Sequence, residues 1–332
     1  MAFNTYTEGT TVYTEFDETM IMPPYLLALI ISDYQIRDTS DRSPEQDTLV
    51  RVPAPEYIND DELGDYALGA AMSIIDGFSE YFGFDYAKSF PQDRSKSDQI
   101  GIPDFAAGAM ENWGLVTYQF YLIYVNSDDY YESSISSVAE VIAHELTHQW
   151  TGNLITCSWW DEIWINEAFA DIGGYLGLRY AEPTWNWETE FTVHELYSAL
   201  RADSTINSRP LINKQNNDGY VVESPAQINR QFDGIAYAKG GSINRMVIHA
   251  MEERRWRAGM IDYLNTNQYT NTDGEIYFSH MQAALKNNPV TDPEWDLPGE
   301  RSDTHFNETF DCWHRQMGFP IIMVNEDNGV LT

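Results

Sequence analysis

The most constraining feature of this sequence is a short motif of histidine and glutamate, which reads His-Glu-Leu-Thr-His from residue 144 to residue 148. Apolar residues recur at three- and four-residue steps over residues 133–150, and this pattern predicts a helix around the motif. On a helix, His144 and His148 lie on one face about a turn apart, so both imidazoles can face a single ion. Zinc accepts such ligands at about 2.0–2.1 Å, and Glu145 is placed to take a proton from a water at the ion. The motif therefore predicts a zinc site with Glu145 as its general base.

A third ligand is expected because catalytic zinc is held by three protein side chains and keeps a fourth position open. Glu167 comes nineteen residues after His148 and lies near the start of a second predicted helix, residues 164–180. Two histidines on a helix could instead be surface or hydrogen-bonded core residues, and a lone glutamate is more often solvated. The spacing and the apolar neighbours of Glu167 favour ligation. We therefore expect one Zn²⁺ ion bound by His144, His148 and Glu167.

A candidate substrate clamp lies upstream, where the sequence reads Gly108-Ala109-Met110-Glu111-Asn112. Small residues allow a backbone edge to approach a peptide closely. The α-amino group of a peptide has a pKa of about 8 and is largely protonated at neutral pH. A carboxylate at Glu111, one residue's length from the metal, would hold this ammonium group and present only the first peptide bond. The segment therefore predicts an exopeptidase that binds free N-termini through Gly108, Ala109, Met110, Glu111 and Asn112.

Apolar periodicity along the chain indicates more helix than sheet. Residues 61–81 repeat apolar side chains at three- and four-residue steps, which predicts a helix with one buried face. Segments typical of β structure occur within residues 1–35, above all at 10–13 and 25–31, and again at 49–52 and 100–116. The predicted fold class is α+β, with a mainly helical body and a small β portion at its front.

Together these motifs resemble those of the gluzincin M1 aminopeptidases, the aminopeptidase N-like group. The likeness runs from residue 16 to residue 324 and includes Lys96-Ser97-Asp98-Gln99, Pro103-Asp104-Phe105, Trp159-Trp160 and the stretch 232–240. It implies a thermolysin-like catalytic fold. It also implies that the hydroxyl of Tyr237 stabilises the oxyanion of the tetrahedral intermediate, as donors aimed at developing charge do. By the same resemblance, Ala109 is the edge that pairs with substrate and Met110 borders the first side chain of the substrate.

The sequence departs from the family pattern at a few positions. Ala168 stands where glycine is usual after the third ligand, and Thr147 and Thr151 replace an alanine and a phenylalanine. Gln119 stands in place of a common arginine. These departures leave the expected ligands and proton carriers intact.

The resemblance also predicts a division of the chain into three parts. Residues 1–35 correspond to the last strands of an N-terminal β domain, residues 36–317 to the catalytic domain, and residues 318–332 to the start of a β-sandwich. Because family members carry both flanking domains, we expect a truncated chain. The resemblance also implies that the N-terminal domain helps to form the amine-binding pocket.

The strongly acidic composition limits the partners. A formal net charge of −33 repels nucleic acid and anionic lipid headgroups, so neither is expected to bind. Apolar runs are much shorter than the ~20 residues of a membrane helix, so this segment should make no membrane contact. Two cysteines, Cys157 and Cys312, permit at most one disulfide. The family includes cell-surface, secreted and cytosolic members, and composition does not choose among them.

The predicted function is that of a zinc aminopeptidase acting on peptides with a free N-terminus. One alternative is a zinc endopeptidase, against which Glu111 argues. A second is an epoxide hydrolase with aminopeptidase activity, a branch that usually has glycine at the position of Ala109. A third is a non-catalytic surface receptor or binding module descended from a peptidase. The preferred N-terminal residue and the oligomeric state are not fixed by the sequence.

Overall fold

The computed structural model describes most of the chain, and all statements below concern those residues. Its backbone is described for residues 2–36, 40–60, 62–91, 94–125, 132–212, 222–288, 306–321, 323–324, 326–327 and 330–331.

Helices make up most of the described structure. In chain order they are α1 (Glu56–Asp60), α2 (Asp65–Phe82), α3 (Glu132–Thr147), α4 (Trp164–Ala181), α5 (Trp187–Phe191), α6 (Tyr197–Asp203), α7 (Pro225–Asn229), α8 (Gly240–Met251), α9 (Glu253–Asn267), α10 (Gly274–Asn287) and α11 (Phe306–Arg315). Two π-helical turns, η6 (Thr192–Leu196) and η7 (Ile235–Lys239), lead into α6 and α8. The predicted helices at 61–81, 133–150 and 164–180 are therefore present as α2, α3 and α4, and the mainly helical α+β fold class is confirmed.

The strands form one four-stranded sheet and three two-stranded ones. They are β1 (Ala2–Glu8), β2 (Thr11–Phe16), β3 (Leu49–Arg51), β4 (Lys96–Ile102), β5 (Ala109–Met110), β6 (Leu115–Gln119), β7 (Ile155–Cys157), β8 (Thr270–Thr272), β9 (Glu326–Asp327) and β10 (Val330–Leu331). The large sheet has the order β3-β4-β6-β5, in which only β5 is antiparallel to its neighbour. Its edge strand β5 carries part of the predicted substrate clamp.

An ionic cluster ties the first two strands of this sheet together. The Arg51 guanidinium donates to both carboxylate oxygens of Asp98, at 2.5 and 2.6 Å, and Lys96 donates to the same carboxylate at 2.8 Å. Asp98 is buried, and burial alone would raise its pKa, but these two cations lower it. Two cationic partners offset the desolvation cost of the buried carboxylate, so this cluster stabilises the pairing of β3 with β4.

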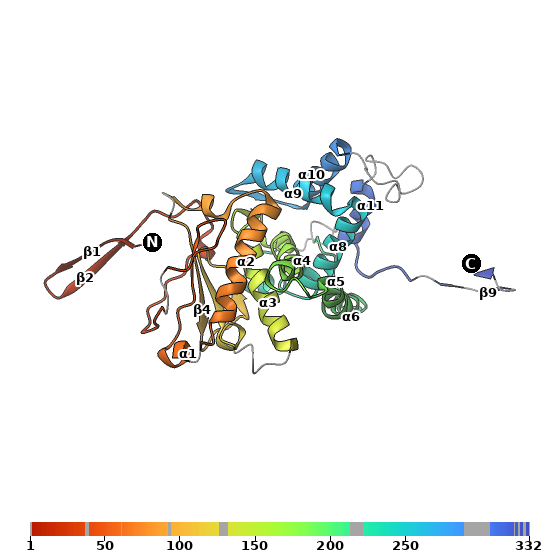
Figure 1. Ribbon diagram of the computed structural model, residues 1–332. Coiled ribbons are helices and arrows are strands. Elements are labelled where there is room, and N and C mark those ends of the chain that lie inside the picture. The colour runs from red at the N-terminus through yellow and green to blue at the C-terminus, as the bar shows by residue number, and fades with distance from the viewer. Residues whose placement is uncertain are drawn as a thin grey trace.

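Close approach of α3 and α4 places the two halves of the predicted metal site side by side (Figure 1). Glycines on α4 allow this approach. A Cβ atom at Gly177 would lie 2.5 Å from the Cβ atom of Ala143, and one at Gly173 would overlap the side chain of Thr147. The larger Thr147, noted above as a departure from the family pattern, is thus accommodated because the facing residue of α4 has no side chain.

The start of the chain differs from prediction in one respect. Residues within 1–35 do include a hairpin, β1–β2, which extends away from the helical body (Figure 1). Residues 25–31, however, form no strand: a 3₁₀ turn, η1 (Pro24–Leu26), is followed by irregular backbone. The exposed Leu27, Leu29 and Ile31 explain the misleading signal, since alternate apolar residues gave a β-like pattern without a strand partner among the described residues.

The C-terminal segment leaves the helical body. Beyond α11 the described chain extends away from the body and ends in the short β9–β10 pair (Figure 1).

Cys157 is buried and Cys312 is exposed, and both are free thiols. Within the described ranges, every helix is too short or too polar to cross a bilayer.

Candidate metal centre

Three side chains converge on one point. His144 lies on α3, His148 directly follows the end of α3, and Glu167 lies on α4. The Nε2 atoms of His144 and His148 lie 3.2 Å apart, and an Oε2 atom of Glu167 lies 3.6 and 3.4 Å from them. Ligands at the corners of a tetrahedron around a metal such as zinc, with bonds of about 2.0–2.2 Å, are separated by about 3.3–3.6 Å. The three donor atoms therefore fit three corners of a tetrahedral site for a divalent metal ion.

The turn after α3 fixes the orientation of His148. Its Nδ1 lies 3.0 Å from the carbonyl oxygen of Thr151, and because a carbonyl can only accept, Nδ1 carries the proton. Nε2 is then the nitrogen that faces Glu167 and His144, and it can ligate a metal once it has lost its proton. Gly152 permits this turn, since its φ is 143° and a Cβ atom there would lie 2.9 Å from Nδ1 of His148. A backbone acceptor behind a ligating histidine is a common way to hold the ring for a metal.

The protonation states of two of the three side chains also suit a metal ligand. Burial lowers the pKa of His144, which keeps its imidazole neutral. Burial would raise the pKa of Glu167, but the neighbouring His148 and His144 lower it to about 2, so the carboxylate is ionised. His148 differs: burial would lower its pKa, yet Glu111 and Glu167 raise it to about 10. A cation that binds here must therefore displace a proton from His148.

Glu145 lies next to this cluster with an unsatisfied oxygen. Its carboxylate is buried, and Oε2 has no hydrogen-bond partner among the described residues. Burial raises the pKa of Glu145 well above its usual range, and the carboxylates of Glu111 and Glu167 add to this effect while His148 opposes it. A buried carboxylate without a partner is costly unless a cation or a polar ligand completes it. The donor set as a whole thus fits a bound dication with a water beside Glu145.

Glu111 faces the same space from the sheet side. One ligand atom each of Glu111, Glu145 and His148 lies within 4.8 Å of the others. The backbone carbonyl of Glu111 accepts hydrogen bonds from the Gln149 and Asn153 side chains, at 3.2 and 2.9 Å. Burial raises the pKa of Glu111, with Glu167 adding to it. The residue is therefore held by the loop after α3, with its carboxylate directed into the site.

The rest of the predicted clamp lies on an edge of the sheet. Ala109 and Met110 pair with Tyr118 and Thr117 of β6, which leaves the other side of β5 without a strand partner in the described part of the chain. The carbonyl of Gly108 accepts from the backbone amide of Gln119 at 2.8 Å and extends this pairing.

Asn112 is used differently from the other clamp residues. Its side-chain amide donates to the carbonyl of Leu26 at 3.3 Å and accepts from the Thr117 hydroxyl at 3.0 Å. The side chain therefore connects the N-terminal segment to β6.

Tyr237 reaches the metal site from a different part of the chain. It lies on the π turn η7, its ring stacks on that of His144 with centroids 6.1 Å apart, and the charge of Glu167 acts on its hydroxyl. Burial raises the pKa of the Tyr237 hydroxyl far above its usual value, with Glu167 adding to it, so the group keeps its proton. All five residues expected to act on the metal or in catalysis, His144, Glu145, His148, Glu167 and Tyr237, are thus brought together.

Comparison with known proteins agrees with this geometry. The model of the peptidase family M1 domain matches residues 66–293. Aminopeptidase N of Canis lupus familiaris is 39% identical over 323 residues, which are 96% of this chain and 30% of that protein. The chain belongs to peptidase family M1.

Other M1 relatives give a consistent picture. Aminopeptidase N of Homo sapiens is 37% identical over 96% of this chain, and glutamyl aminopeptidase of Bos taurus is 32% identical over 94% of it. The chain spans about a third of the length of these relatives, 31% and 29% respectively. The resemblance inferred from the motifs is therefore confirmed at the level of the family.

Sequence reasoning missed three residues of this M1 site. Tyr25 donates to the Gly152 carbonyl and accepts from Asn166, each at 3.3 Å, and the charges of Glu111 and Glu167 act on its hydroxyl. No local motif marks Tyr25, because it reaches the site only through the tertiary fold.

The other two missed residues lie behind His144. One carboxylate oxygen each of Glu140 and Asp171 lies within 4.8 Å of a nitrogen of His144. Burial raises the pKa of Glu140 to about 8 and that of Asp171 well above its usual range. A signal was present in the sequence: Glu140 precedes His144 by four residues and Asp171 follows Glu167 by four, so each shares a helix face with a ligand.

Proposed function

We propose that this chain is the catalytic part of a zinc-dependent aminopeptidase, which hydrolyses the first peptide bond of peptides with a free N-terminus. The observation that carries the proposal is the tetrahedral spacing of the His144, His148 and Glu167 donor atoms, 3.2–3.6 Å apart, beside the unpartnered carboxylate of Glu145. Membership of peptidase family M1 and the names of the relatives support it.

The proposed ligands of a single Zn²⁺ ion are His144, His148 and Glu167. A bound zinc ion supplies Lewis-acid chemistry, which polarises a carbonyl and makes water acidic near neutral pH. Glu145 acts as general base and accepts a proton from the attacking water at its free Oε2. It then delivers that proton to the leaving amine. Such transfers by a positioned side chain contribute about 10²–10⁴-fold to the rate.

Glu111 sets the exopeptidase specificity in this proposal. Its buried carboxylate pairs with the ammonium group of the substrate, because charge-assisted hydrogen bonds are about twice as strong as neutral ones. The edge strand formed by Ala109 and Met110 pairs with the substrate backbone, in the way that extended peptides add to a free sheet edge. Gly108 leaves room for that approach, and Asn112 holds the edge in place.

Tyr237 stabilises the oxyanion in the proposed mechanism. Its hydroxyl remains protonated because burial and the charge of Glu167 raise its pKa. It therefore acts as a hydrogen-bond donor toward negative charge that develops on the substrate oxygen. Removal of one such donor in other enzymes lowers kcat by about 10²–10³-fold.

The experiment that tests the proposal is hydrolysis of a panel of aminoacyl fluorogenic amides, with and without a zinc chelator. We expect turnover that the chelator abolishes and that added zinc restores. Activity that persists without metal, or no turnover by a protein that holds zinc, would contradict the proposal.

An N-acetylated peptide separates the alternatives. An aminopeptidase should leave it intact, because the acetyl group removes the charge that Glu111 binds, whereas an endopeptidase should cleave it. A zinc content near zero would instead favour a non-catalytic binding module, and turnover of an epoxide would identify the hydrolase branch.

A further inference from the structure

We propose that Arg209 and Asp233 form a positioning pair that holds the π turn η7, and with it Tyr237, in register with the metal site. The inference rests on the proposed role of Tyr237. It adds two residues that touch neither the expected metal position nor the substrate and that act through the backbone of η7.

The Asp233 carboxylate caps the start of η7. Its Oδ1 accepts hydrogen bonds from the backbone amides of Ile235 and Ala236, at 3.0 and 3.1 Å. The backbone carbonyl of the same residue accepts from the amide of Tyr237 at 3.1 Å. Asp233 therefore satisfies the first three amides of the turn that carries the tyrosine, including the amide of Tyr237 itself.

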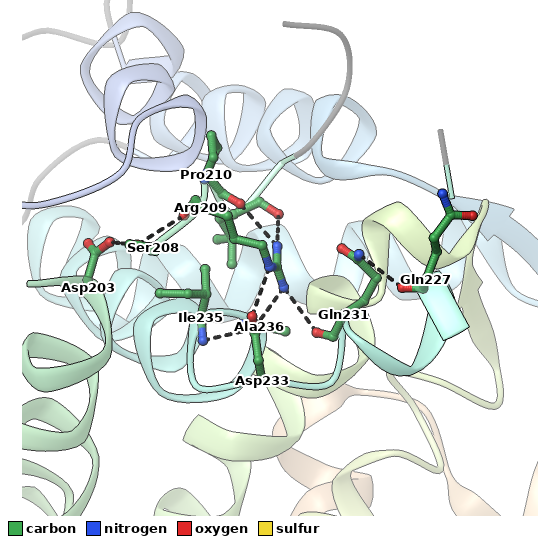
Figure 2. Close-up of polar contacts among 10 residues, drawn as sticks. Asp203, Ser208, Arg209, Pro210, Gln227, Gln231, Asp233, Ile235 and Ala236 are labelled. Carbon is green, nitrogen blue, oxygen red and sulfur yellow. Dashed lines mark hydrogen bonds and ion pairs between the residues drawn. The ribbon is translucent and has the colours of Figure 1, made fainter. Parts of the chain in front are cut away.

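Arg209 fixes the position of this cap. Its Nε and Nη2 donate to the two oxygens of Asp233, at 3.0 and 2.8 Å, which is a bidentate pair. Nη2 also donates to the carbonyl of Gln231, and Nη1 donates to that of Pro210, each at 3.0 Å. Figure 2 shows the guanidinium group between the loop after α6 and the loop before η7, with contacts on both sides. A planar fork that makes these bonds together is a property of arginine and not of lysine.

The geometry of η7 explains why such a pair is needed. π-helical turns are rare, appear mostly as single turns within α-helices, and are frequently found at functional sites. An unsupported turn would relax toward the α-helical repeat of α8, which follows at Gly240. Relaxation would rotate Tyr237 relative to Glu167 and His144. A shift of about 1 Å in a catalytic group can lower the rate about 10²-fold.

The kinetic test uses Arg209→Lys and Asp233→Asn on the protein expressed as its full chain. We expect kcat for an aminoacyl amide to fall at least tenfold in Arg209→Lys, with KM changed less than threefold. Asp233→Asn keeps an acceptor for the two amides, so its kcat should fall less than that of Arg209→Lys. In a Tyr237→Phe background the same Arg209 substitution should change kcat less than twofold, because its effect passes through the tyrosine hydroxyl. An equal fall of kcat in both backgrounds would overturn the inference.

A second measurement does not depend on activity. With 3-fluorotyrosine at position 237, the fluorine NMR resonance should shift or broaden in Arg209→Lys. The matched control is Arg179→Lys, because Arg179 makes a similar bidentate pair with Glu253, at 2.5 and 3.1 Å, away from η7. An unchanged resonance in Arg209→Lys, or the same change in both variants, would overturn the inference. If the wild-type protein hydrolyses no substrate, the proposed function fails while the fluorine comparison still decides this pair.

Discussion

The methyl group of Ala168 packs directly against Gly240, so that a Cβ atom at position 240 would be 2.5 Å from it. Ala168 follows the expected ligand Glu167 on α4, and Gly240 closes the π turn that carries Tyr237. This contact sets the distance between the two elements that supply the ligand and the tyrosine. The family pattern has glycine at the position of Ala168. Here the glycine at 240 leaves the room that the methyl group of Ala168 needs.

Gly240→Ala should reduce the free energy of unfolding by about 1–3 kcal/mol, because overpacking displaces α8 from α4. Ala168→Gly should restore part of the loss, since the next nearest atoms, on Leu211 and the Ala168 backbone, would lie at 3.5 and 3.6 Å. Urea denaturation of the single and double variants measures this coupling.

Gly69→Ala is the control for the Gly240 experiment. Gly69 is exposed on α2, and a Cβ atom added there would meet no neighbouring atom within 4 Å, so alanine at this position should stabilise by about 0.4–1 kcal/mol. Destabilisation by both alanines would argue against the packing explanation.

Glu145→Gln should lower kcat by about 10³-fold while the zinc content stays near that of the wild type. The amide fills the same space but cannot accept a proton from water. The measurement is steady-state hydrolysis together with metal analysis of the same sample. Wild-type kcat in this variant would remove Glu145 as general base.

Glu167→Ala should lose the metal, because two imidazoles alone leave the site with two of its three donors. We expect zinc after dialysis to fall from about one ion per chain to a small fraction of that. Glu8→Ala, on the exposed β1–β2 hairpin, serves as control and should retain the ion. Full retention of zinc by Glu167→Ala would mean that this carboxylate is not a ligand.

Glu111→Gln should raise KM at least tenfold for substrates with a free amine, because the ammonium group loses its charged partner. An N-acetylated analogue, which lacks that charge and is not cleaved, should inhibit the variant and the wild type with the same inhibition constant. The measurements are KM for the amine substrate and the inhibition constant of the acetylated analogue. Equal KM values for the amine substrate in variant and wild type would reject the clamp.

His314 should make stability fall in mild acid. Burial lowers its pKa to about 3, against about 6.5 in an unfolded chain, and its ring packs on Phe278 with centroids 4.3 Å apart. The unfolded state therefore binds a proton first, so stability is complete above about pH 6.5 and is lost as the pH falls toward 3. At pH 5 the loss is about 2 kcal/mol.

The variant His314→Phe tests that linkage. Between pH 7 and pH 5 it should lose about 2 kcal/mol less of its free energy of unfolding than the wild type, because phenylalanine does not titrate. Urea denaturation at both pH values gives the difference. Identical pH dependence in the two proteins would show that His314 is not the responsible group.

Much of the candidate metal site was predictable from local spacing. His148 follows His144 by four residues, and helical geometry alone places both on one face. The fold class followed in the same way, because α2 and α3 each carry a clear apolar period. The prediction of β structure for residues 25–31 was wrong because local propensity does not supply a partner strand.

What only the tertiary structure decided is how distant segments meet. The tetrahedral spacing to Glu167 depends on α3 and α4 packing closely over Gly173 and Gly177. The place of Tyr25 and the support of Tyr237 by Arg209 come from segments far apart in the chain. Sequence alone fixes which groups share a helical face, since that depends on the backbone repeat. Packing in three dimensions fixes distances between elements, since these depend on which side chains leave room for one another.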